Sequence, residues 1–502
     1  MSKRMLLVRC AIAALLAVLW PGSVRADVDN TAQVIQDLQQ KYTELSQKMQ
    51  EKDQQIQELR DKVQSLEHPV QLAPSGVARQ EAIDAALADI DRSQGQRTSA
   101  STDSLAQFPM GGGSTLKLID LSLDVLFNAG ASTESGSELQ TLQGGGHDPS
   151  QRGFTLSQAE ISLMGAVDPY LTGEAHIVYQ VDPDTGETLS ELEEAFATTT
   201  SLPAGLQVKA GHFLSKFGLI NPVHPHAWDW VDQPVINSRI FGGDGMRQGG
   251  VQVSWLTPLP WYSELFFSVQ NATGEQMPSF LAADETIAGR PFQDRKVGSL
   301  GDLVYTGRWA NEWELSDELS LALGTSGAFG ANDTGGDTWL YGGDMKLKWK
   351  PVNNDHGWPF VVWQSEFIGR QFEAARATHN GPDGEPGGGD DVMLASENLD
   401  DWGFYTQLLY GFHRDWAAGL RYEYASGSGN SVDEAGMLIS HNDDPFRDQR
   451  TRISPLLVWQ PTHFSRMRLQ YNYDQAEHLD GDAQSLWFSL EFLFGAHPAH
   501  SY

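Results

Sequence analysis

Two pairs of histidines have spacings that a metal ion could use. His224 and His226 are separated by one proline, and His497 and His500 by two residues. Zinc sites in proteins take three or four nitrogen, sulfur or oxygen ligands, and neither pair has an evident third ligand beside it. The acidic segment 182–187 resembles the start of a calcium loop but lacks the rest of that motif. A structural role in polar loops is the simpler interpretation, so we predict no metal site and no cofactor.

The chain carries none of the short motifs of common catalytic chemistry. It contains no Gly-x-Ser-x-Gly, no phosphate-binding P-loop and no His-Glu-x-x-His. Its only cysteine, Cys10, lies near the start, so neither disulfides nor thiol chemistry is expected. With 34 basic and 66 acidic side chains the net charge is −32, which argues against a nucleic-acid partner, since phosphate contacts need clustered cations. We therefore expect no enzyme and no nucleic-acid partner.

Two groups of charged residues remain, and their chemistry is that of a selective pore, in which walls of charge control ion passage. The first group lies in the segment 218–247 and comprises His224, His226, Asp229, Asp232, Arg239, Asp244 and Arg247. The second group follows later in the chain and comprises Lys346, Lys348, Arg370, Arg421, Arg450, Arg452, Arg466 and Arg468.

From Leu116 to Phe494 the chain repeats short segments in which apolar and polar residues alternate. These segments must position the two groups of charged residues. Leu171, Ala175 and Ile177 face one way while Glu174 and His176 face the other. Such segments run for about 10–14 residues, enough to cross a bilayer at a tilt, whereas soluble strands average about 5–6. Tight turns alternate with long, Gly-rich acidic loops, and tryptophans gather at the tight turns, as in barrels of the bacterial outer membrane.

We predict an all-β fold, a 16-stranded antiparallel transmembrane barrel over 116–502. An even number of strands places both chain ends at the tight-turn, periplasmic side. The predicted strands are 116–127, 154–167, 170–181, 192–200, 205–217, 248–256, 261–270, 300–314, 318–329, 338–350, 358–372, 402–413, 416–426, 449–460, 464–475 and 484–494.

The loop 218–247 is the third long loop, and its apolar residues, such as Trp228 and Trp230, predict that it is packed. We expect it to fold into the lumen as a constriction; the alternative is a loop that caps the barrel from outside. If apolar positions face lipid, the second charged group forms a basic inner wall. Carboxylates would stand opposite it, from the loop and from Asp120, Asp124, Glu160 and Glu174. Either this arrangement sets a transverse field, or the arginines pair with carboxylates such as Glu366 and Glu423 and stiffen the wall.

The first 115 residues predict three further segments. Residues 1–26 read as a signal peptide, with Lys3, Arg4 and Arg9 before an apolar core and Val24-Arg25-Ala26 as cleavage site. Residues 31–68 form heptads that predict a periplasmic coiled coil of undetermined strand number, and residues 69–115 form a linker. The apolar heptad positions are Ile35, Leu38, Tyr42, Leu45, Met49, Ile56, Leu59, Val63 and Leu66.

Short motifs between 153 and 256 add a family resemblance. They are Gly153-Phe154-x-Leu156-Ser157-x-Ala159-Glu160, Asp168-Pro169-Tyr170, Leu202-Pro203-Ala204-Gly205-Leu206, Gly211-x-Phe213, Phe217-Gly218-x-x-Asn221 and Asp232-x-Pro234. The chain thereby resembles bacterial outer-membrane porins of the phosphate-selective porin O and P type. The resemblance implies a sixteen-stranded trimeric channel with a constriction loop.

Two departures limit what this resemblance carries. The loop 218–247 lacks the dense arginine run that phosphate selection needs. We therefore do not extend the phosphate selectivity of those porins to this chain. Related chains are often labelled zinc-regulated TonB-dependent receptors, but such receptors have a plug domain before a barrel of about 22 strands. Only about 90 residues precede the barrel here, too few for a plug.

We therefore expect an outer-membrane porin, a passive diffusion channel for small hydrophilic solutes or ions with a weak preference for anions. The expected partners are outer-membrane lipid, two further copies in a homotrimer, the barrel assembly machinery and small solutes. One alternative is a barrel-anchored structural protein that tethers envelope layers through its coiled coil. Another is a metal-uptake protein that uses His224 and His226.

Overall fold

The computed structural model describes residues 107–110, 114–117, 119–182, 185–282, 287–293, 295–382, 384, 386–387 and 389–495. The chain divides into two compact units, Met1–Thr102 and Asp103–Tyr502. The first unit lies outside the described residues, and so do the predicted signal peptide (1–26), the coiled coil (31–68) and most of the linker (69–115). Two short strands, β1 (Gln107–Met110) and β2 (Ser114–Lys117), pair antiparallel at the end of that linker.

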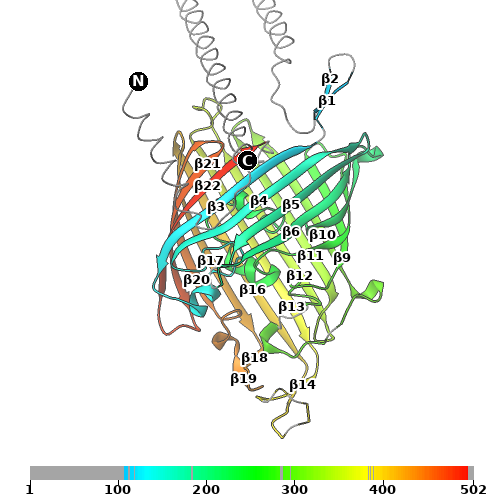
Figure 1. Ribbon diagram of the computed structural model, residues 1–502, viewed down its shortest axis with the longest axis vertical. Helices are drawn as coiled ribbons and strands as arrows, with labels where there is room; N and C mark the ends of the chain where they lie inside the picture. The colour runs from blue at the N-terminus through cyan, green and yellow to red at the C-terminus, as the bar shows by residue number, and fades with distance from the viewer. Residues whose placement is uncertain are drawn as a thin grey trace, which may run out of the picture. The chain divides into compact units, whose positions relative to one another are not determined.

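Sixteen strands close into one antiparallel barrel (Figure 1). Consecutive barrel strands pair along the chain, and the last pairs with the first. Each of the sixteen predicted segments overlaps one barrel strand, so the predicted barrel is confirmed. The strands are β3 (Asp120–Ser132), β4 (Gly153–Asp168), β5 (Leu171–Val181), β6 (Thr188–Thr199), β7 (Leu206–Leu214), β8 (Arg247–Leu256), β9 (Tyr262–Asn271), β10 (Leu303–Ser316), β11 (Leu319–Ala331), β12 (Asp337–Trp349), β13 (Phe360–Ala374), β16 (Glu397–His413), β17 (Trp416–Ser428), β20 (Arg450–Thr462), β21 (Ser465–Ala476) and β22 (Ala483–Gly495).

Side chains alternate along the strands in the sense opposite to that of a soluble protein. On β16, Trp402, Leu408 and Tyr410 are exposed on the outside, while Asp401 and Gln407 are buried inside. The same alternation covers the other strands with large exposed apolar residues outside. Contiguous apolar surface on this scale marks contact with an apolar medium, and an outward apolar band with a polar interior is the pattern of a barrel in a bilayer.

Both ends of the described barrel lie at the tight-turn end. Gly495, the last residue of β22, pairs with Ser122 near the start of β3. Aromatic pairs gather at this end, where Trp416 and Trp459 stack at 5.8 Å between ring centroids. Indole rings concentrate at the interface between lipid and water, so this ring of tryptophans fits one edge of the membrane.

The opposite end carries the long loops and the small elements within them (Figure 1). Among the described residues, no helix combines the length and apolar content needed to cross a membrane. The small elements are the hairpin strands β14 (Ala377–His379), β15 (Val392–Leu394), β18 (Asn430–Val432) and β19 (Leu438–Ser440), the helices α4 (Ser137–Leu142) and α5 (Val235–Phe241), and the 3-10 turns η3 (Pro225–Ala227), η4 (Ile287–Gly289), η5 (Leu300–Asp302) and η6 (His441–Asp443), with η2 (Pro203–Gly205) in a tight turn.

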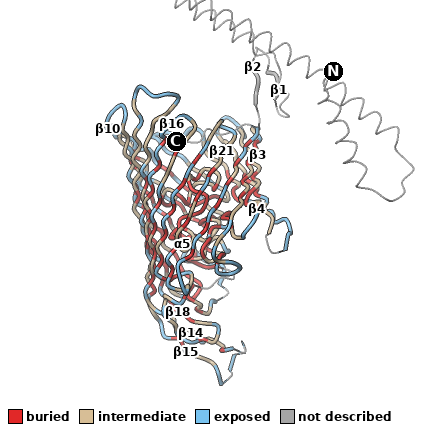
Figure 2. Tube along the Cα trace, turned by 90° about the vertical axis from the view of Figure 1, so that its left-hand side faces the viewer, coloured by how far each residue is buried: buried red, intermediate tan, exposed pale blue. Residues whose placement is uncertain are grey.

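The interior differs between the two ends of the barrel. Near the tight turns, the inward-facing Lys346 and Lys348 of β12 are partly exposed, and so are Thr172 and Glu174 of β5. Towards the other end, inward positions such as Thr338 are buried, and Figure 2 shows buried positions gathered around α5 inside the barrel. The lumen is therefore open to solvent on the tight-turn side and narrower further along, where inward side chains are buried. We call the open part the vestibule.

Candidate functional site: a loop inside the barrel

The segment 215–246, which we call the lumen loop, joins β7 to β8 and packs against the inner wall. Its side chains Ile236, Ile240 and Phe241 are at most 2% exposed. They form one apolar cluster with wall residues that include Leu340 of β12 and Ile368 of β13. Because these wall residues face inward, the loop lies within the lumen and does not cap the barrel from outside. The sequence-based boundaries, 218–247, differ from these by a few residues.

The loop leaves the wall at a position that requires glycine. Gly218 has a φ of +64°, a conformation that side chains rarely adopt. A Cβ atom built there would clash with Glu366 Oε1. The backbone N–H of Gly218 donates to Ser326 Oγ at 3.1 Å, which fixes the direction in which the loop enters the lumen.

Asp232 holds the middle of the loop to the far wall. Its side chain is 1% exposed and forms ion pairs with Arg421 of β17 and, at 2.9 Å, with Arg452 of β20. The amides of Gln470 and Asn472, both on β21, donate to it at 2.7 Å each. Burial opposes ionisation, but the two guanidinium groups outweigh it and lower the pKa of Asp232 to about 2.

Six members of the predicted basic wall are buried arginines with carboxylate partners. Asp232 takes two of them, and the others contact Asp401, Asp474 or Glu491 on neighbouring strands. The pairs are Arg370–Asp401 at 2.6 Å, Arg421–Glu423 at 2.7 Å, Arg450–Asp474 at 2.7 Å, Arg452–Asp474 at 2.8 Å, Arg466–Glu491 at 2.5 Å and Arg468–Glu491 at 3.4 Å. This pairing favours the interpretation in which the arginines stiffen the wall.

Lys346 and Lys348 differ from the six arginines. Both face the vestibule and are only partly buried. Within the described part of the chain, neither lies within 4.0 Å of a carboxylate oxygen. In the predicted wall, theirs are therefore the charges that face the vestibule without a contacting carboxylate among the described residues.

Two other predicted residues, Arg239 and Arg247, tie the C-terminal part of the loop to its surroundings. Arg239 of α5 forms an ion pair with Asp448, which lies in the loop before β20. Arg247 contacts Glu191 of β6 and donates to the backbone carbonyl of Asp244. Asp229 is half-buried in the loop. Together with Asp232 these contacts hold the lumen loop along its length.

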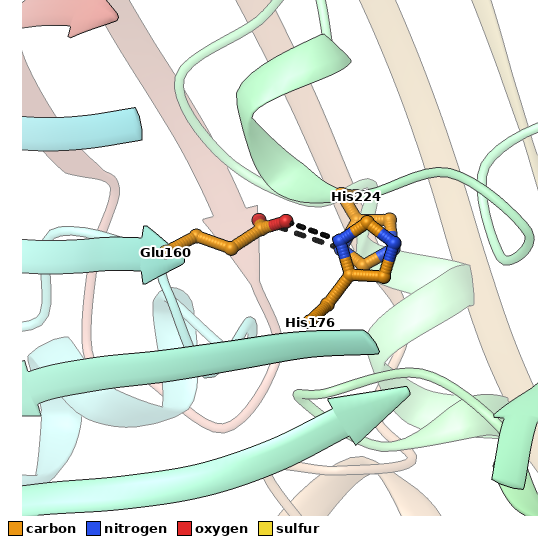
Figure 3. Close-up of side chains that lie close together, drawn as sticks. All are labelled: Glu160, His176 and His224. Atoms are coloured by element: carbon orange, nitrogen blue, oxygen red, sulfur yellow. Dashed lines mark hydrogen bonds and ion pairs between the residues drawn. The ribbon is translucent and has the colours of Figure 1, made fainter. Parts of the chain in front are cut away.

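The two loop histidines, His224 and His226, contact glutamates of the early strands β4 and β6, away from the strands that hold Asp232. Figure 3 shows His224 of the loop and His176 of β5 meeting at Glu160 of β4. His176 Nδ1 lies 2.7 Å from Glu160 Oε1, and His224 Nδ1 lies 3.5 Å from Glu160 Oε2. His226 Nδ1 lies 3.0 Å from the same Oε2 atom. The sequence pair His224 and His226 thus gains partners from two strands far earlier in the chain.

A β-bulge on β6 adds two more carboxylates. His176 pairs with Glu194 and Ile177 with Leu192, so Glu193 is an extra residue in the ladder. The bulge turns both Glu193 and Glu194 inward, and both are buried. His224 Nδ1 lies 2.9 Å from Glu193 Oε2, and its Nε2 lies 2.9 Å from Glu194 Oε2. We call Glu160, His176, Glu193, Glu194, His224 and His226 the histidine–glutamate cluster.

The carboxylates of this cluster control the charge of the loop histidines. Burial alone would lower the pKa of His224, but Glu193 and Glu160 outweigh it and raise that pKa well above its ordinary value. Burial likewise opposes the charge on His226, and Glu160 raises the pKa of that ring. The carboxylates therefore favour the protonated form of both rings.

Sequence patterns placed part of this cluster on the inner wall. Glu160 and His176 occupy inward positions of regular alternation. Glu193 was missed, because strict alternation gives two consecutive residues opposite faces. The tandem pair of glutamates within a predicted strand was the only signal available in the sequence.

A separate acidic group in the loop between β11 and β12 gives a pH-dependent prediction. Asp333 is 1% exposed, and burial raises its pKa to about 7. The pKa of this carboxyl is about 4 in the unfolded chain and about 7 in the folded protein. The fold therefore loses stability as the pH rises from about 4 to 7. Asp333→Asn should therefore stabilise the barrel at pH 8, by on the order of 2–4 kcal/mol, and change little at pH 4, as measured by thermal unfolding in detergent. Asp337→Asn, at a partly exposed position, is the control; an equal gain for both variants would contradict the assignment.

The chain was compared with known sequences and solved structures. No protein-family profile matches it. A protein of Aquifex aeolicus (strain VF5), described as uncharacterized, is 28% identical over 412 residues, which cover 77% of this chain and 80% of that protein. The resemblance to the phosphate-selective porin O and P type therefore stays a prediction.

The solved structures that are similar to the chain are outer-membrane proteins. The outer membrane channel DcaP of Acinetobacter baumannii has a TM-score of 0.49 at 11% identity, over 78% of this chain and 100% of that one. The anion-selective porin from Comamonas acidovorans has a TM-score of 0.43 at 9% identity, over 75% and 99%. The trimer form of OmpT, an outer membrane protein of Vibrio cholerae, has a TM-score of 0.41 at 7% identity, over 75% and 99%. These likenesses are distant, and the barrel assignment rests on the strand pairing of this chain.

Proposed function

We propose that the protein is an outer-membrane porin, a passive diffusion channel for small hydrophilic solutes or ions. The observation that carries this proposal is the lumen loop, packed inside a barrel with an apolar exterior and a polar interior. Solute would enter the vestibule, which is lined by partly exposed polar residues, and pass the loop at the constriction. The interior offers charged and hydrogen-bonding groups, which suit hydrated solutes.

The proposal places the barrel in the outer membrane of a Gram-negative cell, with the predicted coiled coil in the periplasm. A homotrimer and insertion by the barrel assembly machinery remain predictions. The apolar outer face supports contact with lipid. Native mass measurement of the detergent-extracted protein tests the trimer.

Planar-bilayer recording tests the channel. Full-length protein added to a lipid bilayer should give discrete, stable conductance steps that scale with salt concentration. Heat-modified migration on a gel shows whether the added protein is a folded barrel. Folded protein that inserts without any conductance would overturn the proposed function.

The proposed weak anion preference rests on two lysines. Lys346 and Lys348 keep their charges available in the vestibule, whereas the arginines are neutralised by carboxylates. The double variant Lys346→Gln/Lys348→Gln should shift the reversal potential across a salt gradient towards cations. Lys350→Gln, in the exposed turn after β12, is the matched control and should leave it unchanged. Equal reversal potentials in all three proteins would show that these lysines do not set selectivity.

A further inference from the structure

The histidine–glutamate cluster brings three imidazole rings around one carboxylate. The Nδ1 atoms of His176, His224 and His226 lie 2.7, 3.5 and 3.0 Å from oxygens of Glu160. The rings of His176 and His224 are 4.5 Å apart between centroids, and those of His224 and His226 are 5.7 Å apart. A wall that needed only hydrogen bonds would not require three such rings at one point. Imidazole nitrogen and carboxylate oxygen together are the ligands that Zn²⁺ and related divalent ions prefer.

The spacing of the donor atoms fits a single ion. One ligand atom from each of Glu160, His176 and His224 lies within 4.8 Å of the other two. Around a tetrahedral Zn²⁺ with bonds of about 2.0–2.1 Å, neighbouring ligand atoms are about 3.4 Å apart. The contacts of His176 and His224 with Glu160, at 2.7 and 3.5 Å, lie on both sides of that value, so small side-chain adjustments would form the site. His226 or Glu193 stands close enough to supply a fourth ligand.

The cluster also gathers several buried carboxylates. Asp124 of β3 stands directly opposite Glu160 in the ladder, and like charges in that arrangement repel. Asp124 is 4% exposed, and neither of its carboxylate oxygens has a hydrogen-bond partner among the described residues. With Glu193 and Glu194 nearby, four buried carboxylates face three imidazoles.

Metal-binding histidines normally donate their second ring N–H to a carboxylate or carbonyl, which fixes the ring. His224 has this arrangement, because its Nε2 lies 2.9 Å from Glu194 Oε2 while its Nδ1 points to Glu160 and Glu193. His176 has a looser version, with Nε2 3.9 Å from Glu174 Oε2. The residues behind the ligands are therefore placed as a metal site requires.

We propose that the histidine–glutamate cluster binds one divalent transition-metal ion, Zn²⁺ or an ion of similar chemistry, through Glu160, His176 and His224. The nitrogens that bind the ion must be unprotonated, so metal binding and protonation of these rings compete. Since Glu160 and His176 belong to β4 and β5 and His224 to the lumen loop, the ion links the loop to the wall opposite the Asp232 contacts. This site goes beyond passive conduction, and its occupancy can be measured whether or not the barrel conducts.

Equilibrium dialysis of Zn²⁺ against the full-length protein in detergent, stripped with chelator and assayed by elemental analysis, tests the proposal. The wild type should hold one tightly bound Zn²⁺ per chain, and the variant His176→Gln/His224→Gln should lose it. Glu194→Gln, which changes only the group behind His224, should weaken binding by about 10–100-fold. His356→Gln is the matched control, because His356 also lies beside a carboxylate, Asp355 at 2.5 Å, but in an exposed turn; it should bind like the wild type.

Two results would overturn the site. The first is equal Zn²⁺ binding by the wild type and a folded His176→Gln/His224→Gln variant, with folding judged by heat-modified migration. The second needs no variant: the X-ray absorption spectrum of Zn²⁺-loaded wild type should show at least two imidazole nitrogens at about 2.0–2.1 Å. A spectrum with oxygen ligands alone would exclude the cluster even if the double variant failed to fold.

Discussion

Asp232→Asn should release the lumen loop and give a larger, noisier single-channel conductance than the wild type. The aspartate is fully buried and balances Arg421 and Arg452 at once. Removing one member of such a pair leaves buried charge uncompensated, at a cost of about 3–5 kcal/mol. The amide preserves the shape of the side chain, so the effect reports the charge. Planar-bilayer recording measures the conductance, and thermal unfolding in detergent measures the loss of stability.

Asp229→Asn provides the control for this result. Asp229 lies three positions earlier in the same loop and is half-buried. Among the residues that the structure describes, no cationic nitrogen lies within 4.0 Å of its carboxylate. This variant should keep the wild-type stability and step size. An Asp232→Asn channel with wild-type conductance would show that the ion pairs do not position the loop.

Trp230→Ala should also destabilise the loop, through packing and not through charge. The indole is 1% exposed and packs in a cluster with Leu409 of β16 and Leu456 of β20. Its Nε1–H donates to the backbone carbonyl of Ser454 at 3.1 Å. Truncating a buried tryptophan to alanine costs about 3–5 kcal/mol. We expect a clear fall in the unfolding temperature together with a larger conductance.

The matched control for this variant is Trp363→Ala. Trp363 is 43% exposed on the outer face and also donates an indole hydrogen bond, to Thr406 Oγ1 at 2.9 Å. Its removal should leave the conductance unchanged, because the outer face does not contact the lumen loop. If both tryptophan variants altered conductance alike, the effect would come from the barrel wall as a whole.

The barrel was predictable because each strand obeys one local rule. Alternation fixes which residues face lipid and which face inward, and the lengths of the segments fix a membrane crossing. Both signals are contained within about ten neighbouring residues, as β16 illustrates with Trp402 and Tyr410 outside and Gln407 inside. The apolar content of the lumen loop was also a local signal, and Ile236 and Phe241 are indeed buried.

The partners of the charged residues could not be predicted in this way. The sequence left open whether Arg421 and Arg452 form an open basic wall or pair with carboxylates, since no local pattern shows that Asp232 would reach them from another part of the chain. The bulge at Glu193 breaks the alternation by one residue, and the sequence shows that break only as two adjacent glutamates. The alternation of apolar and polar residues does not reveal contacts between residues that are far apart in the sequence.

The contacts of Asp232 also constrain the order of assembly. The residue lies 189 positions before Arg421 and 240 before Asn472, so its charge stays unsatisfied until late strands have been added. Closing such long stretches of chain costs conformational entropy before any contact repays it. A nascent barrel made of β3 to β13 alone would hold a loop with a bare carboxylate, and only the arrival of β17, β20 and β21 neutralises it. The loop is therefore fixed at Asp232 only after these late strands are in place.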